Sequence, residues 1–566
     1  MPRPTSPFRA VRAADGAAAP RSPLRALPAL IALFVLNGVL SMTSWWPTLG
    51  VLPDARIAPE FVGIAVSLAA WMALRGPMPA ALFTTLAIVH ALLVLGRYVD
   101  VVAPSLFGRP ISLYWDMPQL PRFLWVTATG SPGWQVILGM AAILGAAWGV
   151  ILLFRSCWKA LAQALEGLCR RPGFWGSMAP IVALVVANYA GVQATWPYVS
   201  KPVIPTYWKE LGLIWDARSP ERIARLMPAR TAIDEALAKP PHAPLAGLAG
   251  RDLTLMFLES FGAVLYDDPQ VSAAVSATRD RLGAAIAGSG RSVVSAFYRS
   301  PTIGGASDLA HLSMLSGIDL SDPRRYQLLI TTERPTLIQV FQRAGYEVWG
   351  VYPSVFWDWV ERSYYRFDRY LSGPDLDYRG PAFGYWKIPD QFAVARLESA
   401  HPRRGAAPPR MTILATMSTH FPFVPTPPYQ PDWTRVLSDE PFDPDEVRQA
   451  QAEQVDWLRM RPAYVRTVNY AHTWLAAFFS RPDPRDTVYV LFGDHQPTTN
   501  VAGEGARWDV PVHVVASDGR LLDGLRARGF VDGLRPRQDA LGGLHELSGA
   551  LLSAFGEDAA PVAAQR

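Results

Sequence analysis

Five apolar stretches in the first third of the chain constrain its fold more than any other feature. They cover residues 26–47, 60–75, 78–96, 134–154 and 174–194. A helix that crosses a hydrocarbon core of roughly 30 Å needs about 20 mostly apolar residues, so each stretch is about long enough to span a membrane. The pattern therefore predicts a helical membrane domain of about five spans.

The placement of basic residues predicts the orientation of these spans. Arginine and lysine cluster before the first stretch, between the second and third, and after the fourth (Arg3, Arg9, Arg12, Arg21, Arg25, Arg75, Arg155, Lys159, Arg170 and Arg171). With five spans these clusters all lie on one side, which the positive-inside rule makes cytoplasmic. We therefore expect a multi-pass protein of the inner (cytoplasmic) membrane, whose chain beyond about residue 195 is periplasmic or extracellular.

Composition divides the chain into four expected parts. Residues 1–25 are rich in Arg, Ala and Pro and are expected to form a disordered cytoplasmic tail, followed by the membrane domain over 26–194. A proline-rich linker is expected over 195–250 and an outer domain over 251–566. The net charge of +5 comes with no basic stripe in the second half, which argues against nucleic acid as a partner. Both cysteines, Cys157 and Cys169, precede the outer domain, which therefore needs no disulfide.

Strand-like and helical patterns alternate from residue 251 onward. The expected strands are 253–258, 293–297, 347–351, 411–417, 487–492 and 510–516, and the expected helices include 307–316, 333–344, 445–480 and 538–555. Alternation of this kind is typical of an α/β domain with a largely parallel sheet.

Two of the expected strands end directly in metal-ligating residues. Glu259 follows the run LTLMFL, and Asp494 with His495 follows VYVLFG. Ligands gather beyond the carboxyl ends of strands in open α/β sheets, so these side chains are expected in one crevice. Together with a hydroxyl they suit a divalent metal ion such as Mn²⁺ or Zn²⁺, which would activate a nucleophile and neutralise an oxyanion.

Ser307 is the candidate nucleophile and a further candidate metal ligand. Two glycines precede it, and an apolar helical pattern closed by Gly317 follows it. The free N–H groups and the dipole of a helix start favour negative charge, so a hydroxyl there is placed to attack a phosphorus or sulfur centre. The plain alternative is that Ser307 is only a helix cap.

Two further histidines are candidate substrate ligands. His420 follows the run 411–417 and is expected to donate to a leaving-group or phosphoryl oxygen; alternatively, it is a loop residue bonded to the backbone. His311, one turn after Ser307, either contacts the phosphoryl group or faces the core.

Three more residues between these motifs are candidate substrate contacts. Trp357 is suited to stacking on a head group, and Arg362 is suited to clamping a phosphate. Asp390, in the sequence KIPDQF, is a candidate for binding a substrate hydroxyl. Each of the three is otherwise an ordinary surface or packing residue.

This order of motifs resembles the alkaline-phosphatase/sulfatase superfamily, and its architecture is similar to that of the lipoteichoic acid synthases and phosphoglycerol transferases. LESFG resembles the segment of the family's first metal carboxylate, Glu259, and GDHQP resembles its metal loop, Asp494 and His495. STHFPF resembles the motif of a substrate-binding histidine, His420. The segments around Trp357, Arg362 and Asp390 resemble the group's head-group-binding residues.

The resemblance leaves the nucleophile open between two residues. The spacing to Gly317 favours Ser307, and Thr302 is the alternative. The sulfatase signature is absent, because Ser307 and the four residues after it contain neither the Pro nor the Arg of that motif. The resemblance therefore implies a phosphotransferase that moves a phospholipid head group to an envelope glycan or lipid through a covalent phospho-enzyme. The alternatives are a hydrolase of phosphate or sulfate esters and a non-catalytic envelope scaffold.

Overall fold

The structure is a computed structural model that describes most of the chain. The described residues are 27–45, 49–107, 111, 113–117, 120–121, 133–189, 198–216, 218–219, 221–222, 227–228, 230–330, 332–356, 359, 361–384, 387–400, 407–483 and 485–556. The expected tail and Trp357 lie outside this set. The chain divides into two compact units, of which the first includes residues 53–97 and 128–204 and the second residues 205–566.

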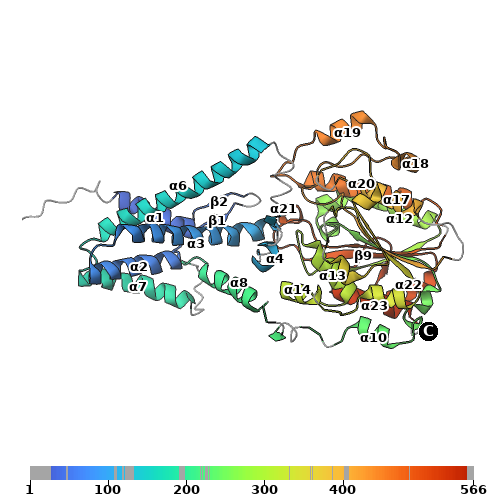
Figure 1. Cartoon of the computed structure of the whole chain (residues 1–566), viewed down its shortest axis with the longest axis horizontal. Coiled ribbons are helices and arrows are strands. Elements are labelled where there is room, and N and C mark those ends of the chain that lie inside the picture. The colour runs from blue at the N-terminus through green and yellow to red at the C-terminus, as the bar shows by residue number, and fades with distance from the viewer. Residues whose placement is uncertain are drawn as a thin grey trace, which may run out of the picture. The chain divides into compact units, whose positions relative to one another are not determined.

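Helices occupy all five apolar stretches. They are α1 (Leu27–Ser41), α2 (Pro59–Arg75), α3 (Ala80–Phe107), α6 (Gly133–Leu165) and α7 (Pro172–Tyr189) (Figure 1). Two segments, Ala80–Ala103 and Gly133–Leu165, are long and apolar enough to cross a membrane, whereas α1 and α7 are shorter apolar helices. The number of membrane crossings stays a prediction.

Several short elements precede the large sheet of the second unit in the sequence. A two-stranded ribbon pairs β1 (Thr43–Ser44) with β2 (Val51–Leu52), and two helices, α4 (Leu113–Asp116) and α8 (Ile204–Asp216), precede the α/β fold. Within the expected linker, α10 (Ala232–Ala238) and the 3₁₀-helix η3 (Ala243–Leu248) bury apolar side chains in the domain core, among them Ile233 and Leu248.

A nine-stranded sheet forms the centre of the second unit. Its strands are β3 (Leu253–Leu258), β4 (Ser292–Arg299), β5 (Glu347–Tyr352), β6 (Arg369–Ser372), β7 (Arg410–Ala415), β8 (Val488–Gly493), β9 (Asp509–Ala516), β10 (Val531–Asp532) and β11 (Ala540–Gly543). Their order is β10-β4-β9-β8-β3-β7-β5-β6, with β11 also paired to β4. The five strands from β8 to β6 are parallel.

The sheet is mixed rather than largely parallel. Strand β9 runs antiparallel to both β8 and β4, and β10 runs antiparallel to β4. The six expected strands are present within two residues at each end, whereas β6, β10 and β11 were not expected. Every residue of β3, β7 and β8 is buried, as is usual for strands covered by helices on both faces.

Helices cover both faces of the sheet (Figure 1). One face packs on α12 (Pro269–Gly288), α17 (Asp390–Ser399) and α20 (Arg461–Phe479), and the other on α13 (Ser307–Ser316), α15 (Leu337–Arg343), α22 (Gly519–Arg526) and α23 (Leu547–Phe555). Alternate β3 residues serve the two cores, since Leu255 and Phe257 face one and Met256 and Leu258 the other.

The remaining helices are short connections around this core. They are α11 (Val264–Asp267), α14 (Pro323–Ile330), α16 (Arg362–Tyr365), η4 (Pro374–Leu376), α18 (Trp433–Val436), α19 (Pro444–Gln451), α21 (Thr499–Ala502) and η5 (Leu544–Glu546).

Two expected helices were wrong in extent. The helix expected over 445–480 is the pair α19 and α20, with irregular backbone between Ala452 and Met460. Pro462 lies in the first turn of α20, where a missing N–H costs nothing, so the second helix starts there. The helix expected over 538–555 begins only at Leu547, since 540–543 pair with β4 as β11.

Candidate active site

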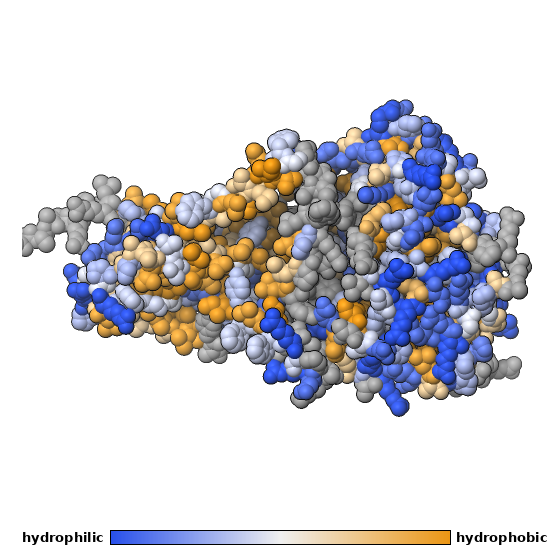
Figure 2. Space-filling model, in the orientation of Figure 1, coloured by the Kyte–Doolittle hydropathy of each residue, from blue (hydrophilic) through white to orange (hydrophobic). Residues whose placement is uncertain are grey.

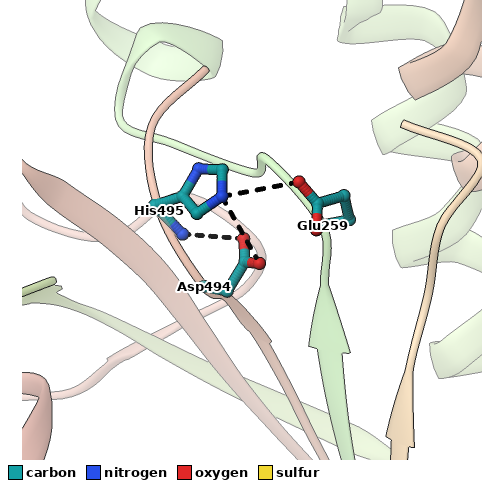
Figure 3. Close-up of side chains that lie close together, drawn as sticks. All are labelled: Glu259, Asp494 and His495. Atoms are coloured by element: carbon teal, nitrogen blue, oxygen red, sulfur yellow. Dashed lines mark hydrogen bonds and ion pairs between the residues drawn. The ribbon is translucent and has the colours of Figure 1, made fainter. Parts of the chain in front are cut away.

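Two adjacent parallel strands place the acidic residues of the site at the carboxyl ends of the central strands. Strands β3 and β8 are paired in register from Leu253 with Val488 to Leu258 with Gly493. Glu259 is therefore the first residue after β3 and Asp494 the first after β8. The two carboxylates lie side by side at the ends of these strands (Figure 3). His495 follows directly, so all three expected ligands meet at the carboxyl ends of the strands.

Gly493 is needed where β8 ends. A Cβ atom on Gly493 would lie 1.7 Å from the carbonyl oxygen of Phe261, much closer than any real contact. The absence of a side chain thus lets the loop after β3 pass directly over the end of β8, which brings Glu259 and Asp494 together.

The three side chains form a compact buried cluster. The ligand atoms of Glu259, Asp494 and His495 all lie within 4.8 Å of one another. The Nε2 atom of His495 is 3.5 Å from Glu259 Oε1 and 3.7 Å from Asp494 Oδ2 (Figure 3). Exposed fractions of 4%, 0% and 2%, respectively, place the cluster out of bulk water.

Ser307 joins this cluster from the start of α13. Its Oγ atom lies 3.2 Å from Glu259 Oε2 and 3.2 Å from His495 Nε2. The three residues before it, Gly304, Gly305 and Ala306, all have positive φ, at 68°, 136° and 63°. This left-handed turn reverses the chain and sets Ser307 in the first turn of the helix, where the positive end of the helix dipole favours an anion.

The hydrogen bonds of His495 fix its tautomer. Its Nδ1 atom lies 2.8 Å from the carbonyl oxygen of Gln496, which can only accept, so the proton resides on Nδ1. The Nε2 atom, which faces Glu259 and Ser307, is then unprotonated and carries a free lone pair. A histidine that ligates a metal typically donates its other ring N–H to a carbonyl in this way.

The electrostatics of the cluster fit a cation. Burial and the nearby Glu259 carboxylate raise the pKa of Asp494 to about 6. Its Oδ1 atom accepts from the backbone N–H groups of Ser260 and His495, at 2.8 and 2.7 Å. Its Oδ2 atom is buried and has no hydrogen-bond partner in the described structure. Two buried carboxylates with an unused oxygen, beside a deprotonated imidazole nitrogen, are a donor set that a divalent metal ion satisfies.

The alternative nucleophile Thr302 lies elsewhere in the same loop. Its side chain is 1% exposed, and its hydroxyl donates to the carbonyl of Gly305 at 2.7 Å. No described contact joins it to the three ligands. Its hydroxyl thus stabilises the left-handed turn that presents Ser307.

His311 and His420 make different contacts near the cluster. The His311 ring packs on Phe257 with 3.8 Å between ring centroids, and its Nε2 atom is 3.9 Å from Asp494 Oδ2. Burial lowers the pKa of both histidines to about 4. The Nδ1 atom of His420 lies 2.6 Å from the carbonyl of Phe421 and donates to it, so the neutral ring has its other nitrogen deprotonated.

Asp390 and Arg362 make contacts of their own outside the cluster. The Asp390 carboxylate is 2% exposed and accepts from the backbone N–H groups of Met417 and Ser418, at 2.6 and 3.0 Å. It therefore holds the loop that leads to His420. The exposed Arg362 guanidinium lies over the Tyr370 ring, 4.9 Å from its centroid.

Several hydroxyl residues that tie the loops together were not expected from the sequence. Ser260 Oγ donates to Glu259 Oε1 at 2.8 Å, and Thr416 Oγ1 accepts from the Glu259 backbone N–H at 3.0 Å. Thr419 Oγ1 donates to the Glu259 carbonyl at 2.6 Å, which ties the His420 loop to the cluster. The available signal was the run TMST before His420, in which Thr416 lies near the end of an expected strand and Thr419 follows it.

Comparison with known proteins gives one family match and several similar solved structures. Residues 306–515 match the sequence model of the sulfatase family, described as "Sulfatase". This segment contains Ser307, His420, Asp494 and His495, but not Glu259. No curated protein matches the chain.

Solved structures resemble the chain at low identity. An alkaline phosphatase superfamily protein from Vibrio parahaemolyticus is 16% identical with a TM-score of 0.36, the match covering 54% of this chain and 66% of that one. The lipoteichoic acid synthase LtaP from Listeria monocytogenes is 15% identical with a TM-score of 0.37, and the match covers 56% of this chain and 77% of that one. The C-terminal periplasmic domain of EcEptC from Escherichia coli is 14% identical with a TM-score of 0.36, and the match covers 54% of this chain and 82% of that one. Such low TM-scores carry no argument about the reaction. The family match concerns one part of the chain: residues 306–515 are similar in sequence to the sulfatase family.

Proposed function

We propose that the chain is a membrane-anchored, metal-dependent phosphotransferase. It moves a phospholipid head group of the phosphoglycerol type to an envelope glycan or lipid through a covalent phospho-enzyme on Ser307. The observation that carries this proposal is the position of Ser307 Oγ, 3.2 Å from both Glu259 Oε2 and His495 Nε2 at a helix start. A hydroxyl serving only as a helix cap has no need of two buried metal-ligand side chains.

In the first step Ser307 Oγ attacks the phosphorus of the lipid phosphodiester. The new Ser307 O–P bond forms, the P–O bond to the lipid breaks, and diacylglycerol leaves as an alcohol with the proton that Ser307 releases. The Ser307 hydroxyl proton is held by Glu259 Oε2, toward which the hydroxyl donates. The backbone N–H groups at the start of α13 face the phosphoryl oxygens. A metal ion bound by Glu259, Asp494, His495 and Ser307 would lower the pKa of the hydroxyl and neutralise charge on the phosphoryl group.

In the second step an acceptor hydroxyl attacks the same phosphorus. The new O–P bond forms, the Ser307 O–P bond breaks, and the proton of the acceptor hydroxyl ends on Ser307 Oγ. We expected His420 to donate to a leaving-group or phosphoryl oxygen, but its hydrogen bond to Phe421 favours the opposite proton direction. With Nδ1–H donated to that carbonyl and a pKa of about 4, the ring is neutral near pH 7, and its Nε2 atom carries the lone pair that can accept a proton during the reaction. We therefore propose His420 as the group that takes the proton of the acceptor hydroxyl.

The remaining candidate residues keep supporting roles in the proposal. His311 neighbours Asp494 and limits water access to it, and Asp390 positions the His420 loop through two backbone N–H groups. Arg362 and Trp357 are proposed to bind the head group. The metal ion is proposed to be Mn²⁺ or Zn²⁺, since imidazole and carboxylate ligands suit both.

We further propose that all five apolar helices cross the inner membrane and that the α/β domain lies outside it. The exposed apolar side chains of α6 support this placement, since Ile137, Ile143 and Leu144 are each at least 68% exposed. Figure 2 shows this apolar surface over the helices of the first unit. Large contiguous apolar surfaces of this kind mark contact with lipid or with another protein.

Trapping the covalent intermediate tests the proposal. The full chain in detergent micelles is mixed with Mn²⁺ and phosphatidylglycerol radiolabelled in its head group, then quenched in acid. We expect label on the wild type, none on Ser307→Ala, and label retained on Thr302→Val, which serves as the matched control in the same loop. Label on Ser307→Ala, or its loss only in Thr302→Val, would refute the assignment of the nucleophile.

A phosphate- or sulfate-ester hydrolase is the second candidate, favoured by the sulfatase family match over residues 306–515. It requires water, rather than a glycan or lipid hydroxyl, as the final acceptor. Adding an acceptor lipid to the labelled enzyme separates the two candidates. Label recovered on the lipid supports the transferase, and label released only as free phosphate ester supports the hydrolase.

A further inference from the structure

A groove lies between three apolar helices of the first unit, outside the site described above. It has a volume of about 650 Å³ and is lined by α2, α3 and α7 together with Ile204. Its walls include Gly63, Val66, Val89 and Val186. The volume falls in the roughly 300–1,000 Å³ range of small-molecule sites, and the lining is almost wholly apolar.

One ionisable side chain lines this groove. Glu60 is 4% exposed, and its Oε1 atom accepts from the backbone N–H groups of Val203 and Ile204, at 2.6 and 3.2 Å. Its Oε2 atom is buried and has no hydrogen-bond partner among the described residues. A buried carboxylate oxygen with no partner is costly in apolar surroundings, so the site is incomplete without a donor or a cation.

The proposed membrane orientation places Glu60 at the outer end of its helix. Arg75, at the other end of α2, belongs to the side expected to be cytoplasmic, so Pro59 and Glu60 face the outer leaflet. The valines of the groove then lie deeper in the hydrocarbon layer. The groove therefore has a polar end near the membrane surface and an apolar part below it. A phospholipid has the same arrangement, with a polar head group above its acyl chains.

We propose that this groove binds a phospholipid of the outer leaflet, with an acyl chain between α2, α3 and α7 and an ammonium head group on Glu60. Charge complementarity favours an ammonium group, because it both donates to Oε2 and neutralises the carboxylate. An anionic head group without a cation does neither. The inference rests on the proposed membrane placement and not on the proposed chemistry at Ser307.

The test uses the full chain in detergent micelles with a phosphatidylethanolamine that carries a photoactivatable diazirine in its acyl chain. After illumination, peptides of α2 and α7 are expected to carry the label. Excess unlabelled phosphatidylethanolamine is expected to compete, and phosphatidylglycerol to compete about tenfold less well. Equal competition by the two lipids overturns the assignment of the ammonium head group.

Two variants and one control separate the groove from a non-specific lipid surface. Gly63→Phe places an aromatic ring at the wall of the groove, where a Cβ atom meets nothing within 4 Å. Gly145→Phe in α6 is the matched control, because a Cβ there also meets nothing within 4 Å and the residue does not line the groove. We expect Gly63→Phe to abolish labelling of α2 and Gly145→Phe to leave it unchanged. Equal labelling of the two variants overturns the groove.

Glu60→Gln tests the carboxylate itself. It keeps the oxygen that accepts from Val203 and Ile204 and removes the charge. We expect labelling by the ethanolamine lipid to fall about tenfold, which corresponds to about 1.4 kcal/mol. Unchanged labelling overturns the role of Glu60. Loss of phosphoryl trapping on Ser307 with labelling intact would instead count against the proposed chemistry alone, so the two failures are distinguishable.

Discussion

Replacing Asp494 by asparagine isolates the electrostatic cost of the carboxylate cluster when no cation is bound. Asparagine keeps the oxygen that accepts from the Ser260 and His495 N–H groups. The amide NH₂ takes the place of Oδ2, which has no hydrogen-bond partner in the described part of the chain. Glu259 lies within 4.8 Å and is an acceptor for this new donor. The substitution therefore preserves the hydrogen bonds and removes one buried negative charge.

The sign and size of the effect follow from the pKa of Asp494. Burial, and then repulsion by Glu259, raise this pKa from 3.8 to about 6. The folded state thus holds the proton more tightly than the unfolded state does. The resulting stabilisation is fully present below pH 3.8 and is lost as the pH rises to about 6. At about 1.4 kcal/mol per pH unit, the loss is about 3 kcal/mol.

The assay is urea unfolding of the full chain in detergent micelles with a chelator, followed by pulse proteolysis of the α/β domain. We expect the free energy of unfolding of Asp494→Asn, relative to that of the wild type, to be larger by about 2 kcal/mol at pH 7 than at pH 4. Asp523→Asn is the control, since its side chain is 67% exposed and its relative stability should not change with pH. A pH-independent difference for Asp494→Asn would refute the reasoning. With saturating Mn²⁺ at pH 7 the wild type should be more stable than Asp494→Asn, because only the wild type keeps all its metal ligands.

Three further substitutions test the framework around the site. Thr302→Val removes the hydrogen bond to the Gly305 carbonyl and should lower the free energy of unfolding by about 1 kcal/mol in urea titrations, and wild-type stability would contradict the role of that bond. Gly493→Ala places a Cβ against the Phe261 carbonyl and should cost about 3 kcal/mol, seen as a lower Tm in thermal unfolding; an unchanged Tm would disprove the close approach. Asp390→Ala leaves two buried N–H groups of the His420 loop unpaired and should lower kcat about tenfold with a smaller change in the KM for the lipid, and a change in KM alone would argue against a positioning role.

The strands that carry the ligands were predictable because they are buried on both faces. The runs before Glu259 and before Asp494 are continuous apolar segments that stop abruptly at a charged residue, and the structure ends β3 and β8 within one residue of the expected positions. The proximity of the two residues followed from the rule that ligands gather at the carboxyl ends of parallel strands. Ser307 was identified by the glycines before it and by Gly317 after its helix.

Strand direction and the supporting hydrogen bonds were not predictable in the same way. Whether β9 runs parallel or antiparallel to β8 depends on the path between them, and no residue pattern within either strand specifies it. The short strand β11 (Ala540–Gly543) has low intrinsic strand preference and forms only because β4 lies beside it. The contacts of Ser260 and Thr416 join residues more than 150 positions apart, so they appear only once the chain is folded.

The strand order also decides when the site can form during synthesis. Strand β3 is the first strand of the nine-stranded sheet to leave the ribosome, yet its partners are β7 and β8, which are made much later. The apolar run of Leu253–Leu258 must wait with both backbone edges unpaired, and unpaired apolar edges are where chains aggregate. A chain truncated before Val488 would therefore leave the β8 edge of this strand unpaired and lack two ligands, making it a substrate for quality control rather than a weakly active enzyme.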